Sequence, residues 1–327
     1  LFYNISRRYI LEEQLIQHLK DLVSINSVNP DLSKLGQGEK QIAEFVHNHF
    51  TKLNIESKVH IIKDDRCNTT AFLKGNNPEK ILLLNGHLDT VGIEDMKDPF
   101  ILKNDGDHLY GRGTYDMLAG CAIQMALATF FSKTPCPISL AFTFVADEEN
   151  MSMGMEHLIE HYLPTLPSKP FLGIFMEPTE EAIGISHKGY SWYELKIEGL
   201  AAHGSRPEQG INAIFPMEHA LSELSKINKE LLDEEPHPHL GHATLHPGMI
   251  SGGTAKSVIA SESNIKWERR TLPGESKQKL DDELQRVISA VLKAPGNHKV
   301  TGSQVYNRPP NEVKNHSTIE TLRKVAG

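Results

Sequence analysis

Apolar residues recur at two different spacings along the first half of the chain. Helical spacing, or an apolar run rich in Ala and Leu, predicts helices at 9–23, 39–53, 116–131 and 154–163. Short β-rich or continuously apolar runs predict strands at 59–62, 69–73, 81–84, 138–145 and 171–176. Because strands alternate with helices, we expect residues 1–185 to form an α/β domain with a mixed, mostly parallel sheet flanked by helices.

The pattern changes after residue 185. Residues 190–199 alternate, with Trp192 and Glu194 on one side and Tyr193 and Leu195 on the other, as in a strand with one exposed face. Further elements are predicted at 212–232 (helix), 243–251 and 258–268 (strands) and 276–293 (helix). We expect a smaller α+β domain at 186–297. Beyond it, a strand is expected at 299–305 and a helix from Asn315.

Composition narrows the class of protein. The chain has 327 residues, 39% hydrophobic and 23% charged, which is typical of a globular protein of two domains. No apolar stretch approaches the roughly 18 residues of a membrane span, and we identify no signal peptide. The net charge of −8 argues against nucleic acid as a partner. Three cysteines without a Cys-x-x-Cys pair indicate a reducing, cytoplasmic setting.

Candidate metal ligands follow three of the predicted strands. His87 comes just after the strand at 81–84, the pair Glu148 and Glu149 follows 138–145, and Glu177 follows 171–176. Ligands of open α/β sheets bind outside the carboxyl ends of the strands. Asp116 stands before a predicted helix, where a negative charge is tolerated. We therefore expect these side chains to converge on one edge of the sheet.

Converging carboxylates repel one another unless protons or a cation neutralise them. One imidazole among several carboxylates favours Zn, Mn or Co over Ca or Mg. Asp89, two residues after His87, is placed to accept the second imidazole N–H and orient the ring. Of the adjacent Glu148 and Glu149, one can coordinate metal while the other takes a proton from water.

Eight motifs in order carry a family resemblance. They lie at 85–91, 110–117, 146–149 and 176–179, and then at 201–207, 210–214, 251–255 and 270–274. Together they resemble the M20 metallopeptidase family, which includes acetylornithine deacetylases, succinyl-diaminopimelate desuccinylases, aminoacylases and glutamate carboxypeptidases. The resemblance implies a zinc-exopeptidase-like catalytic domain with a lid or dimerisation domain inserted at 186–297, so that residues 298–327 would return to the catalytic domain. It covers the chain from about Leu19 to the end.

The resemblance also implies a set of residue roles. Two divalent metal ions are expected, zinc first, with cobalt or manganese as alternatives. His87 and Glu177 would bind one ion, Glu149 would bind the other, and Asp116 would bridge both. Glu148 would act as general base.

Further roles follow from the same resemblance. Asp89 would orient the ligand His87, and the lid would form a homodimer in which His203 reaches the partner's active site to stabilise the oxyanion. Arg270, beside Arg269, would bind a substrate carboxylate. No nucleic-acid or membrane partner is expected.

The substrate is expected to be an N-acyl amino acid or a short peptide. Residues 27–30 (Ser-Val-Asn-Pro) and 85–91 resemble the acetylornithine deacetylase branch, so hydrolysis of an N-acyl amino acid is the first expectation. A dipeptidase or carboxypeptidase is the alternative, and a catalytically silent metal-binding relative is another. In the family a C-terminal His completes the second metal site. Because this sequence reaches Gly327 before such a motif, we expect the C-terminal part of the catalytic domain to be missing from it.

Overall fold

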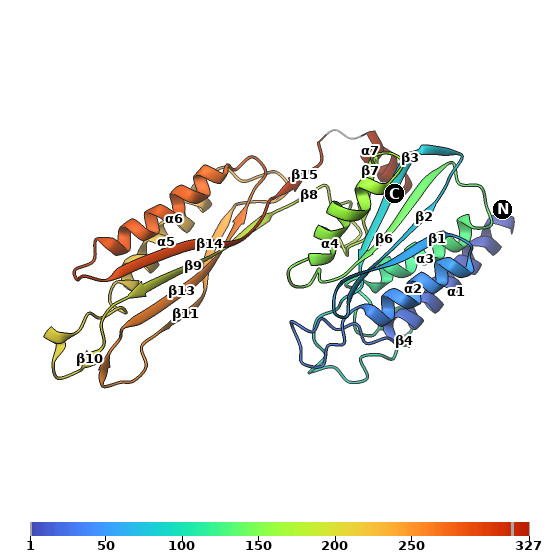
Figure 1. The fold of residues 1–327 in the computed structure, drawn as a ribbon. Coiled ribbons are helices and arrows are strands. Elements are labelled where there is room, and N and C mark those ends of the chain that lie inside the picture. Colours follow the sequence, from blue (N-terminus) through green and yellow to red (C-terminus); the bar gives the residue numbers. More distant parts are fainter. Residues whose placement is uncertain (1, 315–316, 327) are drawn as a thin grey trace. The chain divides into compact units, whose positions relative to one another are not determined.

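The structure, a computed structural model, describes residues 2–314 and 317–326. The chain forms two compact units, unit 1 (Leu1–Glu181) and unit 2 (Ala182–Gly327), shown in Figure 1. The predicted boundary after residue 185 thus falls within four residues of the division. No helix of the described residues is long and apolar enough to cross a membrane.

Unit 1 is built on a five-stranded sheet in the order β1-β2-β6-β3-β7. The strands are β1 (Glu56–Lys63), β2 (Arg66–Leu73), β3 (Asn77–His87), β6 (Ile138–Val145) and β7 (Leu172–Phe175). Strand β3 is parallel to β6 and β7, whereas β2 is antiparallel to β1 and β6. Every strand except β2 therefore runs in one direction, which confirms the expected mixed, mostly parallel sheet. A small hairpin, β4 (Lys103–Asp105) and β5 (His108–Tyr110), lies outside this sheet.

Helices cover both faces of this sheet. They are α1 (Phe2–Val23), α2 (Lys40–Lys52), α3 (Leu118–Phe131) and α4 (Met153–His157), the last continuing as a π-helical turn (Leu158–Tyr162) and a 3-10 turn (Leu163–Thr165). Helix α1 packs on α3, and α2 packs on β1 and β2, while α4 also contacts these two strands. The predicted helices at 39–53 and 116–131 are therefore confirmed.

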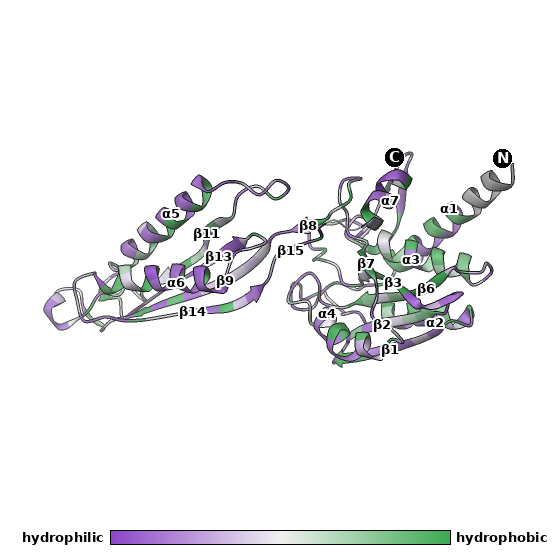
Figure 2. Ribbon diagram, turned by 90° about the horizontal axis from the view of Figure 1, so that it is seen from above, coloured by the Kyte–Doolittle hydropathy of each residue, from purple (hydrophilic) through white to green (hydrophobic). Residues whose placement is uncertain are grey.

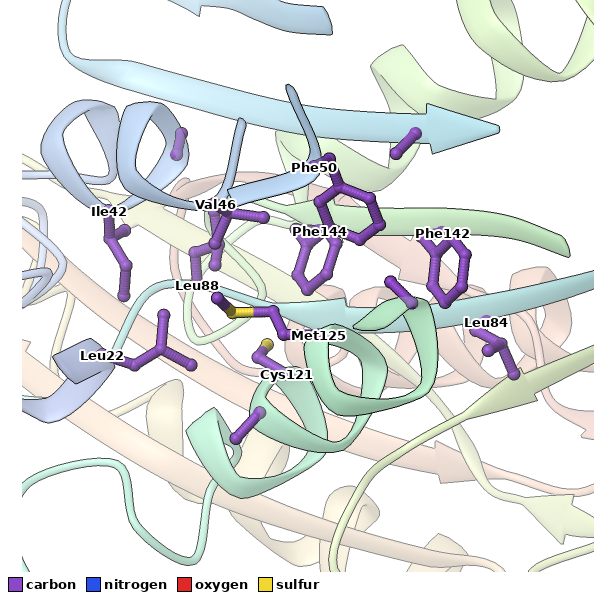
Figure 3. Close-up of a cluster of buried hydrophobic side chains, with 14 of the residues drawn as sticks. Leu22, Ile42, Val46, Phe50, Leu84, Leu88, Cys121, Met125, Phe142 and Phe144 are labelled. Carbon is purple, nitrogen blue, oxygen red and sulfur yellow. The ribbon is translucent and has the colours of Figure 1, made fainter. Parts of the chain in front are cut away.

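The main core lies between the sheet and helices α1, α2 and α3 (Figure 3). Phe50 of α2 contacts Phe142 and Phe144 of β6, with ring centroids 5.1 and 5.8 Å apart. Val145, next along β6, instead packs with Leu158 on the other face. Side chains of a strand alternate between faces, so β6 is buried on both sides, as its mostly apolar sequence predicts.

Unit 2 is an antiparallel sheet in the order β11-β13-β9-β14. Its elements are β9 (Gly189–Glu198), α5 (Met217–Asp233), β11 (Thr244–Gly252), β13 (Glu262–Thr271), α6 (Lys277–Leu292) and β14 (Lys299–Arg308). Helices α5 and α6 pack together on one face of the sheet, where Leu195 and Ile265 are buried. In Figure 2, α5 carries both hydrophilic and hydrophobic residues, as a helix with one buried face does. The sheet with one exposed face is confirmed.

The predicted return to the first domain after residue 297 is wrong. Strand β14 pairs along its length with β9 and completes the sheet of unit 2. Only a short connection separates α6 from β14, so the strand returns beside its own domain rather than crossing to the other. The chain then forms β15 (Asn311–Glu312), paired with β8 (Ser186–His187), and α7 (Ser317–Ala326). Residues 315 and 316, where this last helix was expected to begin, lie outside the described residues.

Candidate metal centre and active site

His87 ends strand β3 and is the buried centre of the candidate site. Its Nδ1 lies 2.9 Å from the backbone oxygen of Asp89, a contact in which Nδ1–H donates. That hydrogen bond leaves Nε2 as the nitrogen that can bind a metal. In the present arrangement Nε2 lies 3.0 Å from Asp116 Oδ1. Burial opposes a charge on the ring, but the hydrogen bonds to Asp116 and Asp89 raise the pKa of His87 well above its usual value.

Three acidic side chains surround this Nε2 atom. Besides Asp116, Glu177 Oε1 lies at 3.7 Å and Glu148 Oε2 at 3.9 Å. One potential ligand atom each of His87, Asp116 and Glu177 lies within 4.8 Å of the others, and this is the single group of its kind in the described part of the chain. Strands β3, β6 and β7 are parallel neighbours, which explains why the residues that follow them meet at one edge.

Glu149 does not belong to this close group of three. It is still near enough to be affected by it: burial first, and then the charge of Asp116, raise the pKa of Glu149 to about 7. Burial likewise raises the pKa of Glu177 to about 7, with Glu148 adding to the effect. The hydrogen bond to His87 lowers the pKa of Asp116. The structure thus brings three of the four predicted ligands together and places the fourth nearby.

Asp89 is fully buried and holds the turn that carries the two glutamates. Its carboxylate accepts hydrogen bonds from the backbone amides of Glu148, at 3.0 Å, and Glu149, at 3.1 Å, and from Asn29 Nδ2, at 2.9 Å. Its Oδ1 is also 3.5 Å from His87 Nδ1. Asp89 therefore connects the orientation of the imidazole to the position of both glutamates, which is more than the sequence suggested.

A buried arginine behind this turn was missed by the sequence analysis. Arg66 pairs with Glu39, Asp147 and Asp31, each at 2.8 Å. Asp147 directly precedes Glu148 and has a positive φ of 64°. Asn29 joins the two networks, since its Nδ2 donates to both Asp89 and Asp147 and its Oδ1 accepts from Arg66. The one available signal was that Asn29 falls within the 27–30 segment.

The donor set fits a divalent cation. Asp116 and Glu177 crowd around one imidazole with Glu149 nearby, and the raised pKa values of the two glutamates reflect burial and repulsion between the carboxylates. A divalent cation would reverse that effect by favouring the ionised carboxylates. One imidazole nitrogen with carboxylate oxygens is a ligand set that suits Zn, Co or Mn.

His203 and Arg270 lie in unit 2. His203 belongs to β10 (Ala202–His203), which pairs with β12 (Val258–Ile259), and its Nδ1 is 2.8 Å from Ser205 Oγ. Arg270 is half-exposed and donates to Glu268 at 2.7 Å. Its neighbour Arg269 is fully buried in ion pairs with acidic residues of its own unit. Arg270 is thus the member of the pair that can meet a ligand. The roles of His203 and Arg270 in a site stay predictions.

The sheet topology and the residues at its edge are those of an α/β protein with a candidate site for a divalent metal ion. Comparison with known proteins places the chain within that class. Residues 185–295 match the peptidase dimerisation domain of M20 peptidases, and residues 68–177 match peptidase family M28. The acetylornithine deacetylase of Vibrio atlanticus (strain LGP32) is 30% identical over 290 residues, covering 86% of this chain and 75% of the relative. That of Buchnera aphidicola subsp. Schizaphis graminum (strain Sg) is 29% identical over 313 residues, covering 93% and 80%.

Solved structures of peptidases share this fold. A tripeptidase from Staphylococcus aureus superposes with a TM-score of 0.74 at 21% identity, covering 96% of this chain and 81% of its own. A Bacillus subtilis protein described as a dinuclear metal-binding peptidase of the M20 family has a TM-score of 0.68 at 15% identity, covering 97% and 80%. The chain belongs to the M20 family of metallopeptidases and is a metal-dependent hydrolase of amide or peptide bonds.

Proposed function

We propose that this chain removes the acyl group from an N-acyl amino acid, as an acetylornithine deacetylase does. The curated relatives described above carry that name and support this substrate class. The observation that carries the proposal is the position of Glu148, whose Oε2 lies 3.9 Å from the ligand nitrogen of His87. A carboxylate in this position, adjacent to a metal ligand set, is suited to proton transfer.

The proposed metal ligands are His87 and the acidic side chains near it. His87 and Glu177 would hold one divalent ion, Glu149 a second, and Asp116 both, with zinc as the first choice and cobalt or manganese as alternatives. Bound there, the ions would supply Lewis acidity, polarising the scissile carbonyl and making water more acidic.

The chain's own residues account for the proton transfer and the binding of substrate. Glu148 accepts a proton from the attacking water and later donates it to the leaving amine. Asp89 accepts a hydrogen bond from the backbone of Glu148 and lies 3.5 Å from the ring nitrogen of His87, so it positions the backbone that carries the base next to the ligand. His203 of a partner subunit stabilises the oxyanion, and Arg270 binds the carboxylate of the amino acid.

Metal removal and a substrate panel test this proposal. Dialysis against a chelator should abolish hydrolysis of N²-acetylornithine, and added Zn or Co should restore it. The panel compares N-acetyl amino acids with dipeptides under the same conditions. Full activity in a verified metal-free sample would exclude the metal-dependent reaction. Cleavage of dipeptides alone would replace the deacylase by a peptidase, and no cleavage by metal-loaded protein would indicate a silent relative.

The role of His203 requires a homodimer formed through unit 2, the unit that contains the match to a peptidase dimerisation domain. His203→Ala should bind metal normally but turn over roughly 10²–10³-fold more slowly, as expected for loss of one oxyanion donor. Mixing His203→Ala with Glu148→Gln subunits gives dimers in which one site keeps both residues. These mixtures should regain part of the activity; demonstrated mixed dimers without any regain would exclude the cross-subunit role.

A further inference from the structure

Unit 1 also contains a group of three imidazoles that is separate from the candidate metal centre. His60 lies in strand β1, His157 ends helix α4, and His161 lies in the π-helical turn that follows. The ring centroids of His157 and His161 are 4.7 Å apart, and those of His60 and His157 are 5.5 Å apart. Residues nearly a hundred positions apart in the sequence are thus in ring contact.

Two of the three ring pairs have separations compatible with a shared metal ion, but the ligand nitrogens of all three rings do not lie within 4.8 Å of one another in the present arrangement. A zinc-bound imidazole nitrogen lies about 2.0–2.1 Å from the ion, and tetrahedral angles then place the centres of two bound rings about 5 Å apart. Both measured separations, 4.7 and 5.5 Å, are close to this value. His157 and His161 are also four residues apart on a helical segment, which puts them on the same side. Local π-helical turns occur often at functional sites.

The same group contains polar atoms that lack a partner. His157 Nδ1 and Tyr162 Oη are buried, and neither has a hydrogen-bond partner among the described residues. Tyr162 is only 9% exposed, and its ring lies 6.1 Å from that of His60. Buried polar atoms without partners are rare in folded proteins, and an ion or water that the atoms bind is one explanation for them.

His60 is held in an orientation suited to a ligand. Its Nε2 lies 2.9 Å from Thr70 Oγ1, and when Nε2 donates this hydrogen bond, Nδ1 becomes the nitrogen that can bind metal. Burial, with the charge of Lys58 adding to it, lowers the pKa of His60 to about 4. Burial and the neighbouring His161 also lower the pKa of His157. Both rings are therefore neutral at pH 7, the form that coordinates a metal.

We propose that His60, His157 and His161 form a binding site for a divalent late transition-metal ion, for which Zn²⁺ is the probe. Imidazole nitrogens favour Zn, Ni or Cu over Mg or Ca. His161 is 61% exposed, so its side chain can rotate to complete the site without disturbing the core. An ion here would join β1 to the helix that follows the Glu148–Glu149 turn. The proposal goes beyond the proposed hydrolase function and does not depend on it.

Zinc stoichiometry tests the site. Wild-type protein and variants are dialysed to equilibrium against micromolar Zn²⁺, and bound zinc per chain is measured by mass spectrometry. His161→Ala and His157→Ala should each bind one ion fewer than wild type. His108→Ala is the matched control, since His108 is an exposed histidine of the same unit outside the group, and it should bind as much zinc as wild type. Mg²⁺ supplied in place of Zn²⁺ should not bind at this site.

The candidate metal centre is separated from this site by a further variant. His87→Ala should reduce zinc at the metal centre but keep the ion that depends on His161. If His161→Ala binds as much zinc as wild type, or if the additional ion binds only at millimolar concentration, the site does not exist. The same conclusion follows if the double variant His87→Ala/His161→Ala binds as much zinc as His87→Ala. Because the readout is bound metal rather than hydrolysis, failure of the proposed function would not affect this result.

Discussion

Arg66→Met removes a guanidinium that pairs with two fully buried carboxylates, Glu39 and Asp147, each at 2.8 Å. The methionine side chain fills similar space but offers no donor, so both carboxylates are left buried without this partner. Removing one member of a buried ion pair typically costs about 3–5 kcal/mol. Arg66 has a third, more exposed partner in Asp31, which contributes less because water solvates it.

The structure places the expected cost at the lower end of that range. Burial, and then the charge of Asp89, raise the pKa of Glu39 to about 7 in spite of Arg66. Without Arg66 that pKa rises further, so Glu39 takes up a proton and avoids remaining as an unpaired charge. We therefore expect a loss of about 3 kcal/mol at neutral pH, which corresponds to a fall in the unfolding temperature of roughly 6–12 °C for a unit of this size.

Thermal unfolding followed by circular dichroism measures this change. Lys40→Met is the matched control, because Lys40 and Asp65 form an exposed pair at 3.8 Å that should contribute about 0–1 kcal/mol. Adding Glu39→Gln to Arg66→Met should recover part of the loss by removing one unpaired carboxylate. If Arg66→Met and Lys40→Met lower the unfolding temperature equally, the buried network does not stabilise unit 1 as argued.

Three further predictions each compare two proteins. Glu149→Ala should reduce bound metal, whereas Glu148→Gln should keep it and lower kcat by roughly 10²–10⁴-fold. His49→Gln should make the unfolding temperature less sensitive to acid between pH 6.5 and about 4, because burial lowers the pKa of His49 to about 4 and the unfolded chain binds the proton first. Arg270→Ala should raise KM without destabilising unit 2, whereas Arg269→Met should lower its unfolding temperature. Each prediction fails if the two proteins compared behave alike.

The sequence predicted best those features that depend on local patterns. Strand β6 has the bounds expected from its mostly apolar sequence, since both of its faces are covered and its two polar residues, Ser139 and Thr143, are small and buried. The alternation in β9 showed which face is buried, and the exposed side of that strand is where it was expected. His87, Glu149 and Glu177 were found because each follows a strand and parallel strands bring their carboxyl ends to one edge, whereas Asp116 was found by its position next to a helix.

Features that depend on distant partners could not be predicted. Arg66 and Asp147 are 81 residues apart, and nothing local to either residue indicates their contact. The pairing of β14 with β9 was missed for the same reason, since an alternating pattern reveals a buried face but not the neighbouring strand. The strand positions alone did not show which of Glu148 and Glu149 binds metal and which transfers the proton. The motif resemblance supplied these individual roles.

Unit 1 contains two groups of crowded acidic side chains, and they are neutralised in different ways. Glu39 and Asp147 are paired with a guanidinium of the same unit, which offsets part of their negative charge within the protein. Asp116, Glu149 and Glu177 form no ion pair with a lysine or arginine of the described chain, and His87 is the sole cationic partner found for this group. Mutual repulsion and burial therefore remain uncompensated there, which raises the free energy of the folded state and favours any divalent cation that binds. The affinity for metal thus arises from charge that the fold itself leaves unbalanced.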